Sequence, residues 1–422
     1  MTSESKGAAA QVLSQLGLTA RRPLLEAEAQ EAFRTIVRPL LAHLGVPCKL
    51  VETFSAGKRC TSAWVEGERY IVFDHAVLEC FAQLDWLSGP SANASLIRAA
   101  FQRVLAESAR GAQNVELYAF FVRRALEVRS LFPQSGELPD VSFARFWQAA
   151  FVLCHEAAHA LPHDHSMRQA LDARAVSSVS SLTNELVLGL TGQLTDMLGA
   201  PDGKEKSPVQ GDLEEWIATR DDLGLGEDAI FSTYEAVGTD PRFLDEVACD
   251  SFAVTGLVHA LTIRRETIPT DAFPELLLNV MLAAYRGFLH HRLLSYFDDV
   301  LRSLPAHLVA ERINPLKLRL MVEFGLRGNL VVLQMLEAVG DLTSDAAKAT
   351  LRERFATIQM RHTENLFEVG DHLLATTVLD EGFNDALRSM LTEDKIDLRE
   401  IDNDPLSIFL QTDSLWQELV ET

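Results

Sequence analysis

The stretch FVLCHEAAHALPHDH, residues 151–165, joins two kinds of residue that seldom occur together. Its apolar residues recur at the spacing of a core helix, yet one glutamate and four histidines stand among them. A buried polar group without a hydrogen-bond partner costs about 1–3 kcal/mol. These side chains therefore need partners that the stretch does not itself contain.

His155, Glu156 and His159 form the pattern HExxH. Residues four apart share one face of a helix, with Cβ atoms about 5–6 Å apart, so both imidazoles can bind one metal ion. Zinc is the usual occupant of this pattern. Glu156 is displaced around the helix, and we expect it to act as a general base on a water molecule beside the metal. The pattern predicts a Zn²⁺ site on an apolar helix.

A catalytic zinc site needs a third protein ligand, and Glu246 is the favoured candidate. It belongs to the apolar stretch FLDEVACDSFAVTGL, residues 243–257, which predicts a second helix. Asp250 lies one turn further and is expected to accept a hydrogen bond from the outer ring nitrogen of a ligand histidine. An ordinary helix N-terminus would explain Asp245 but not an aspartate deep in the apolar stretch.

The alternative third ligand is His165, whose spacing from His159 is that of the metzincins. Metzincins have glycine where this chain has Pro162, and that glycine lets the chain turn sharply out of the helix. Proline has φ fixed near −65° and cannot copy a left-handed turn. This departure weighs against His165.

The composition limits the class of protein. With 422 residues, 47% of them hydrophobic, the chain can bury a sizeable core. A formal net charge of −22 repels phosphate groups, so neither nucleic acid nor an anionic membrane is an expected partner. Five scattered cysteines without a CxxC pair are typical of reduced thiols, and no signal segment or membrane-length apolar run is evident. We expect a cytoplasmic protein.

Local patterns predict an α+β protein that is predominantly helical. Residues 60–74 predict a β-hairpin, because two runs rich in β-branched and aromatic residues flank Glu66-Gly67-Glu68. CKLVETF, residues 48–54, has the same strand-like composition. Helices are expected at about residues 75–87, 93–109, 112–131, 142–161, 243–257 and 275–304.

The chain divides into three expected regions. The first is an N-terminal helical segment over residues 1–45, which ends at a Gly-Val-Pro stop signal. The second is a catalytic core over 46–319, with insertions at about 88–141 and 162–242 and a loop at about 199–228. The third is an acidic helical bundle over 320–422.

HExxH followed by Glu-x-x-x-Asp on a later helix resembles the gluzincin branch of zincin metallopeptidases. EVACDSFA, residues 246–253, is similar to a stretch in soluble relatives of the CAAX-processing and HtpX-type peptidases. SAWVEGERYIVFDHAVL, residues 62–78, resembles the edge hairpin and helix that precede HExxH in that group. The likeness covers less than a quarter of the chain, Cys249 replaces a small alanine, and the transmembrane helices of the membrane members are absent.

The resemblance implies a zincin-like core and a zinc peptidase that hydrolyses protein or peptide substrates. A separate donor would stabilise the oxyanion that forms at the cleaved bond. The nearest match to the family's downstream element is LPAHLVAERINPL, which offers His307 as that donor and Arg312 as its support or as a clamp for a substrate carboxylate. Other conceivable donors are Tyr70, Tyr234, Tyr285 and Tyr296.

Two further expectations follow. An extended peptide could add a strand to the edge of the hairpin, as in β-augmentation. The rival reading of the whole chain is a non-catalytic helical protein for binding or regulation, with a structural or vestigial metal site. All the residues of the expected site are present, which favours the enzyme.

Overall fold

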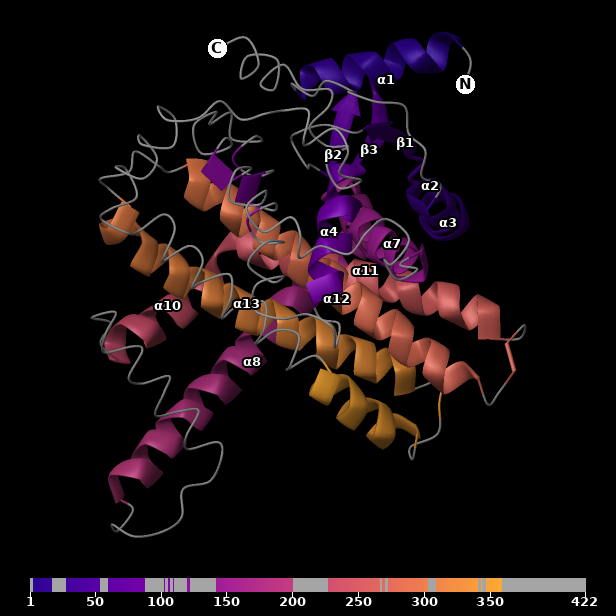
Figure 1. Ribbon diagram of the computed structural model, residues 1–422. Coiled ribbons are helices and arrows are strands. Elements are labelled where there is room, and N and C mark those ends of the chain that lie inside the picture. The colour runs from indigo at the N-terminus through magenta and orange to yellow at the C-terminus, as the bar shows by residue number, and fades with distance from the viewer. Residues whose placement is uncertain are drawn as a thin grey trace.

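The helices and strands form a predominantly helical molecule with one small mixed sheet (Figure 1). The computed structural model describes residues 3–16, 28–53, 60–87, 142–199, 227–265, 268–269, 272–302, 309–340 and 347–358, and isolated positions at 102, 105–106, 109, 120–121 and 343. The loop expected at 199–228, and the helices expected at 93–109 and 112–131 apart from those isolated positions, lie outside this part.

The sheet has three strands in the order β1-β3-β2. Its members are β1 (Lys49–Thr53), β2 (Thr61–Val65) and β3 (Glu68–Asp74). The antiparallel pair β2–β3 confirms the hairpin expected at 60–74. Glu66 and Gly67 have φ of 52° and 81°, the left-handed values that tight hairpin turns need. The sequence did not predict that β1 would pair with β3 in parallel.

The two faces of the sheet join different cores, because neighbouring residues of a strand point to opposite sides. Tyr70 and Val72 pack on α1 (Ser3–Gln15), through Val12 and Leu13. Ile71 and Phe73 belong to the main core, with the helices. The sheet thus lies between α1 and the helical body (Figure 1).

The expected N-terminal helix is present as three consecutive helical segments. They are α2 (Glu28–Ala32), the π-helical turn η1 (Phe33–Val37) and α3 (Arg38–His43). Gly45 follows with φ of 70°, as the stop signal required.

Four of the other helices confirm the predictions at 75–87, 142–161, 243–257 and 275–304, although α11 continues eight residues beyond 257. These four are α4 (Ala76–Leu87), α7 (Ser142–His159), α11 (Pro241–Arg265) and α12 (Phe273–Arg302). The further helices are α8 (Ser166–Gly199), α10 (Glu227–Thr239) and α13 (Val309–Gly340). α13 contacts α11 and α12 and continues through residue 320, where the sequence places the start of the acidic C-terminal region.

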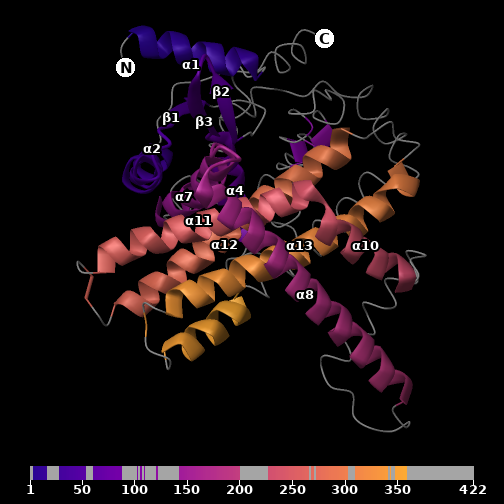
Figure 2. The same ribbon diagram turned by 180° about the vertical axis from the view of Figure 1, so that it is seen from behind.

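The central helix is α7, which contacts α2, α4, α11, α12 and two strands of the sheet (Figure 2). It packs closely against α11 because Gly256 has no side chain. A Cβ atom at Gly256 would lie 2.8 Å from Sγ of Cys154. This close packing brings the two helices expected to carry the ligands face to face.

Among the described helices, α11 is long and apolar enough to cross a membrane by length and composition. This corrects the expectation that no apolar run reaches that length. Within the fold, however, 67% of its most apolar stretch is buried, and the helix lies against α7, α8 and α13. Burial of this kind is also typical of a core helix.

Candidate metal centre

His155 is fixed from its outer side by Asp250. The histidine is buried on α7, and its Nδ1 lies 2.9 Å from Oδ1 of Asp250 on α11. An ionised carboxylate only accepts hydrogen bonds, so Nδ1 of His155 carries the proton and donates it. This bond leaves Nε2 to face the space between the helices, which is the arrangement typical of a metal-binding histidine.

His159 has acceptors on its outer side as well. Its Nδ1 lies 3.2 Å from Oδ2 of Asp245 and 3.4 Å from Sγ of Cys249. Its Nε2 lies 3.3 Å from Nε2 of His155. The two inner nitrogens therefore converge, each held by groups of α11 on the opposite side of its ring.

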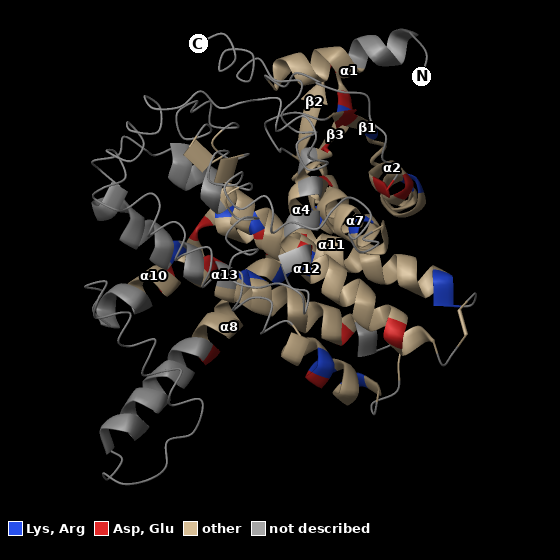
Figure 3. Cartoon of the chain, viewed as in Figure 1, with Lys and Arg blue, Asp and Glu red and all other residues tan. Residues whose placement is uncertain are grey.

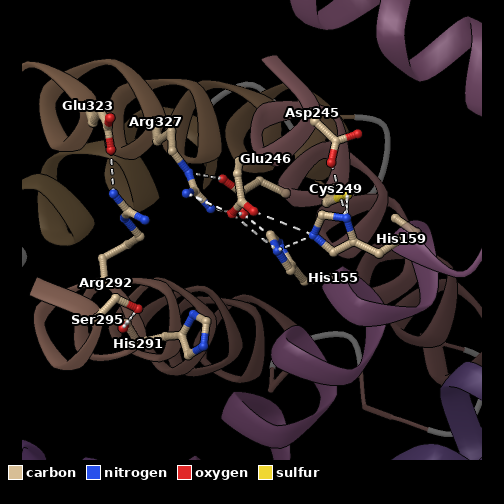
Figure 4. A network of polar contacts seen from close by, with 12 residues as sticks. His155, His159, Asp245, Glu246, Cys249, His291, Arg292, Ser295, Glu323 and Arg327 are labelled. Atoms are coloured by element: carbon tan, nitrogen blue, oxygen red, sulfur yellow. Dashed lines mark hydrogen bonds and ion pairs between the residues drawn. The ribbon is translucent and has the colours of Figure 1, made fainter. Parts of the chain in front are cut away.

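Glu246 completes a set of three converging groups (Figure 4). Its Oε2 lies 3.5 Å from Nε2 of His155, and its Oε1 lies 3.6 Å from Nε2 of His159. Two donor atoms that are each about 2.1 Å from one tetrahedral ion lie about 3.4 Å apart. The spacing of these three side chains fits a single small metal ion.

Cys249 offers a second combination. His155, His159 and Cys249 provide ligand atoms that all lie within 4.8 Å of one another. The cysteine, however, contacts Nδ1 of His159, whereas the ring's Nε2 is the atom beside His155. Geometry therefore favours Glu246 over Cys249 as the partner of the two inner nitrogens.

His165 is held by backbone groups instead of joining the centre. Its Nε2 donates to the carbonyl of Leu44 at 3.1 Å, and its Nδ1 accepts from the N–H of Met167 at 3.2 Å. Both ring nitrogens are thus engaged, one at the end of α3 and the other at the start of α8. This arrangement does not bring together the ligand set that the metzincin spacing would require.

Glu156 is buried, and burial raises the pKa of its carboxyl to about 7, although the positive charges of His155 and His159 lower it. The backbone N–H of Ser62, on β2, donates a hydrogen bond to this carboxylate. The glutamate therefore connects the HExxH helix to the strand at one edge of the sheet.

The ion pairs of the centre also shift the pKa values of the side chains that could bind a metal. Burial lowers the pKa of His155, but hydrogen bonds to Asp250 and Glu246 raise it to about 10 overall. Cys249 and Glu246 likewise raise the pKa of His159 to about 11 against the effect of burial. Burial raises the pKa of Glu246, yet the charge of Arg327 and the two histidines hold it well below its usual value.

Two buried arginines that the sequence analysis missed complete the network. Arg168 on α8 pairs with Asp245, donates to the carbonyl of Ala158 at 3.1 Å, and lies 3.7 Å from Sγ of Cys249. Arg327 on α13 pairs with Asp250 and Glu246. The available signal for Arg327 was its isolation in an apolar stretch, whereas Arg168 lies in the polar stretch HSMRQALDARA and has no such signal.

A further histidine lies beside the centre, on α12. The ring centre of His291 is 6.5 Å from that of His155 (Figure 4). Burial and the positive charge of His155 lower the pKa of His291 to about 4. The next residue, Arg292, pairs with Glu323 on α13, where charged residues of both signs gather beside α10 (Figure 3).

The expected oxyanion donors are only partly placed. His307 lies outside the described residues, and so do the side chains of Arg312 and Tyr296. Tyr70 packs on the α1 side of the sheet and donates to Glu68, whereas Tyr285 packs on Phe288 and Phe355. Tyr234 is partly buried against the main core.

No protein-family model, curated protein or solved structure matches this chain. The likeness to gluzincins therefore rests on the residues of the centre and their arrangement.

Proposed function

We propose that this chain is a zinc-dependent peptidase with a gluzincin-type centre. One observation carries the proposal: Nε2 of His155, Nε2 of His159 and the carboxylate of Glu246 converge at 3.3, 3.5 and 3.6 Å. Glu156 is buried between the two histidines on the same helix. A zincin-like core, a protein or peptide substrate and a cytoplasmic location belong to the same proposal.

Bound Zn²⁺ would supply a Lewis acid that polarises the carbonyl of the cleaved bond and acidifies water. The chain's own residues keep the site ready for the ion. Asp250 orients His155, and Asp245 with Cys249 does the same for His159, so both inner nitrogens face the ion without rearrangement.

Glu156 is assigned the role of general base. Its carboxylate would accept a proton from the attacking water and later deliver it to the leaving amine. The hydrogen bond from Ser62 fixes one side of the carboxylate, which limits the orientations from which it can take up a proton.

Among the side chains that the structure describes, we assign His291 as the hydrogen-bond donor to the carbonyl oxygen of the cleaved bond. It reaches the centre from α12, which carries none of the proposed ligands, and its ring lies near that of His155. Donors aimed at the developing oxyanion are a large part of catalysis in acyl transfer. His307, the donor suggested by the family resemblance, stays a prediction.

The sheet supports a peptide as the substrate, because β2 is an edge strand of the described sheet. N–H groups that point away from a paired strand recur at every second residue. Since Ser62 donates to Glu156, the N–H of Trp64 also points away from β3. An extended peptide that pairs with this edge would pass directly beside the general base.

Trp64→Pro removes one outward N–H without touching the hydrogen bonds to β3. We expect kcat/KM for peptides to fall about 2- to 12-fold, the equivalent of one hydrogen bond of about 0.5–1.5 kcal/mol, with the metal retained. Trp64→Ala is the matched control, because it removes the same side chain and keeps the N–H. Equal cleavage by the two variants would rule out pairing at this position.

The proposal is tested by elemental analysis of the purified wild type beside His159→Ala and His165→Ala. We expect about one zinc per chain in the wild type and in His165→Ala, and little or none in His159→Ala. A folded wild type that binds no zinc, even when zinc is supplied, would leave a helical interaction protein as the better account. Zinc lost from His165→Ala as well as from His159→Ala would favour the metzincin alternative.

A further inference from the structure

Arg327 joins α13 to the proposed metal centre through three contacts. Its Nε and Nη2 lie 2.7 and 3.0 Å from the two carboxylate oxygens of Asp250, and its Nη1 lies 3.0 Å from Oε2 of Glu246. The guanidinium is buried and lies 5.4 Å from the ring centre of Phe288. One planar group thus holds both carboxylates at fixed positions.

We propose that Arg327 is a positioning residue for the third ligand, and that α13 is therefore part of the metal centre. The inference rests on the proposed function, since it assigns Arg327 the task of holding Glu246 in the place where it meets the ion. Nothing in the HExxH and Glu-x-x-x-Asp patterns assigns that task to any residue.

Glu246 needs such a residue more than the histidines do. His155 is held by Asp250 and His159 by Asp245, each through the outer ring nitrogen. Glu246 has a longer and more flexible side chain, 36% of which is exposed. Arg327 fixes the oxygen Oε2 and thereby limits the side-chain orientations that lead out to solvent.

Arg327 also connects two side chains, Asp250 and Glu246, that have different roles in the proposed centre. The carboxylate that orients His155 and the carboxylate proposed to bind the ion share the same guanidinium. A shift of α13 would therefore change both the orientation of one ligand and the position of another. Lysine cannot reproduce this, because its ammonium is a single point of charge without the rigid fork of arginine.

Arg327 would act on the metal affinity in two opposite ways. By holding Glu246 in place it would raise the affinity, and through its positive charge it would lower the affinity. A positive charge beside the site repels the ion, but Asp250 and Glu246 supply two negative charges to one guanidinium. The carboxylates outnumber the arginine, so the site keeps a favourable field for a dication. Partners that fix a ligand from behind typically change metal affinity 10- to 100-fold, and we expect loss of positioning to prevail.

The experiment compares Arg327→Lys with the wild type and with Arg319→Met. Arg319 is the matched control because it lies on α13 and pairs with Asp240 and Glu323, away from the ligands. Zinc affinity is measured by competition with a chromogenic chelator. The visible spectrum of the Co²⁺-loaded protein reports the coordination geometry, which a merely structural arginine would not change.

We expect Arg327→Lys to bind zinc about 10- to 100-fold more weakly and to show an altered Co²⁺ spectrum, with Arg319→Met close to the wild type. A folded Arg327→Lys with wild-type affinity and spectrum would overturn the inference and leave the proposed function intact. An equal loss in Arg319→Met would overturn it too, because docking of α13 alone would then explain the effect. A wild type without zinc would overturn both.

A second comparison applies if Arg327→Lys does not fold. Asp250→Asn is compared with the double variant Asp250→Asn, Arg327→Met, in which uncharged residues replace both members of the buried ion pair. The ratio of their zinc affinities isolates the action of Arg327 on Glu246. We expect the double variant to bind at least about tenfold more weakly, and equal affinities would refute the inference.

Discussion

Replacing Glu156 by glutamine is expected to abolish peptide cleavage and to leave the metal in place. Glutamine has the size of glutamate but cannot take a proton from water, and general-base catalysis contributes about 10²- to 10⁴-fold to a rate. We therefore expect kcat to fall by at least about 100-fold. The measurement combines turnover of a quenched fluorescent peptide library with elemental analysis of the same samples.

The matched control is Glu185→Gln, an exposed position on α8 that makes the same chemical change away from the centre. Its turnover should equal that of the wild type. If cleavage by Glu156→Gln also equalled the wild-type value, the glutamate would not be the base. If no peptide were cleaved by the wild type and a bound partner were retained by both variants, the rival account of a non-catalytic binding protein would hold.

Removing Glu246 is expected to have the largest effect on the metal itself. Glu246→Ala leaves only the two histidine nitrogens of the favoured ligand set, and we expect zinc to fall from about one ion per chain to nearly none. Cys249→Ala removes a contact to the outer nitrogen of His159, so affinity should decrease about tenfold or less and the ion should stay bound. Elemental analysis and chelator competition measure both.

The opposite result would change the ligand set. Zinc that survived in Glu246→Ala and was lost in Cys249→Ala would mean that a thiolate joins the two histidines. Cys249→Ser then serves as the control, since it keeps the size of the side chain and removes the sulfur. Loss in both alanine variants would indicate four protein ligands, which is typical of a structural zinc site.

The sequence predicted the elements whose signals are local. The hairpin follows from Glu66-Gly67 between two strand-like runs, and the HExxH helix follows from its own periodicity. The convergence of Glu246 and Asp250 on His155 could also be predicted, because charged residues in an apolar helix need a buried partner. The parallel pairing of β1 could not, since no local pattern specifies which strand it meets.

The same argument, applied consistently, would have found Arg327. It is the one charged residue between Glu323 and Glu337 in an apolar stretch, just as Asp250 is isolated on α11. The stretch lies in the region expected to be an acidic helical bundle, where the net charge obscures one isolated arginine. Arg168 has no such signal, because Asp172 and Arg174 lie close to it in a polar stretch.

The centre is built from parts of the chain that are made at different times. Asp250 lies 95 residues after His155, and Arg327 lies a further 77 residues along the chain. A nascent chain that has just passed α11 holds every proposed ligand and the base, but not the guanidinium that fixes Glu246. Contacts so distant in sequence form slowly, because a long loop must be closed first. The order of synthesis thus separates the appearance of the proposed ligands from that of the guanidinium, so a growing chain that has not yet passed α13 would lack the proposed support of Glu246.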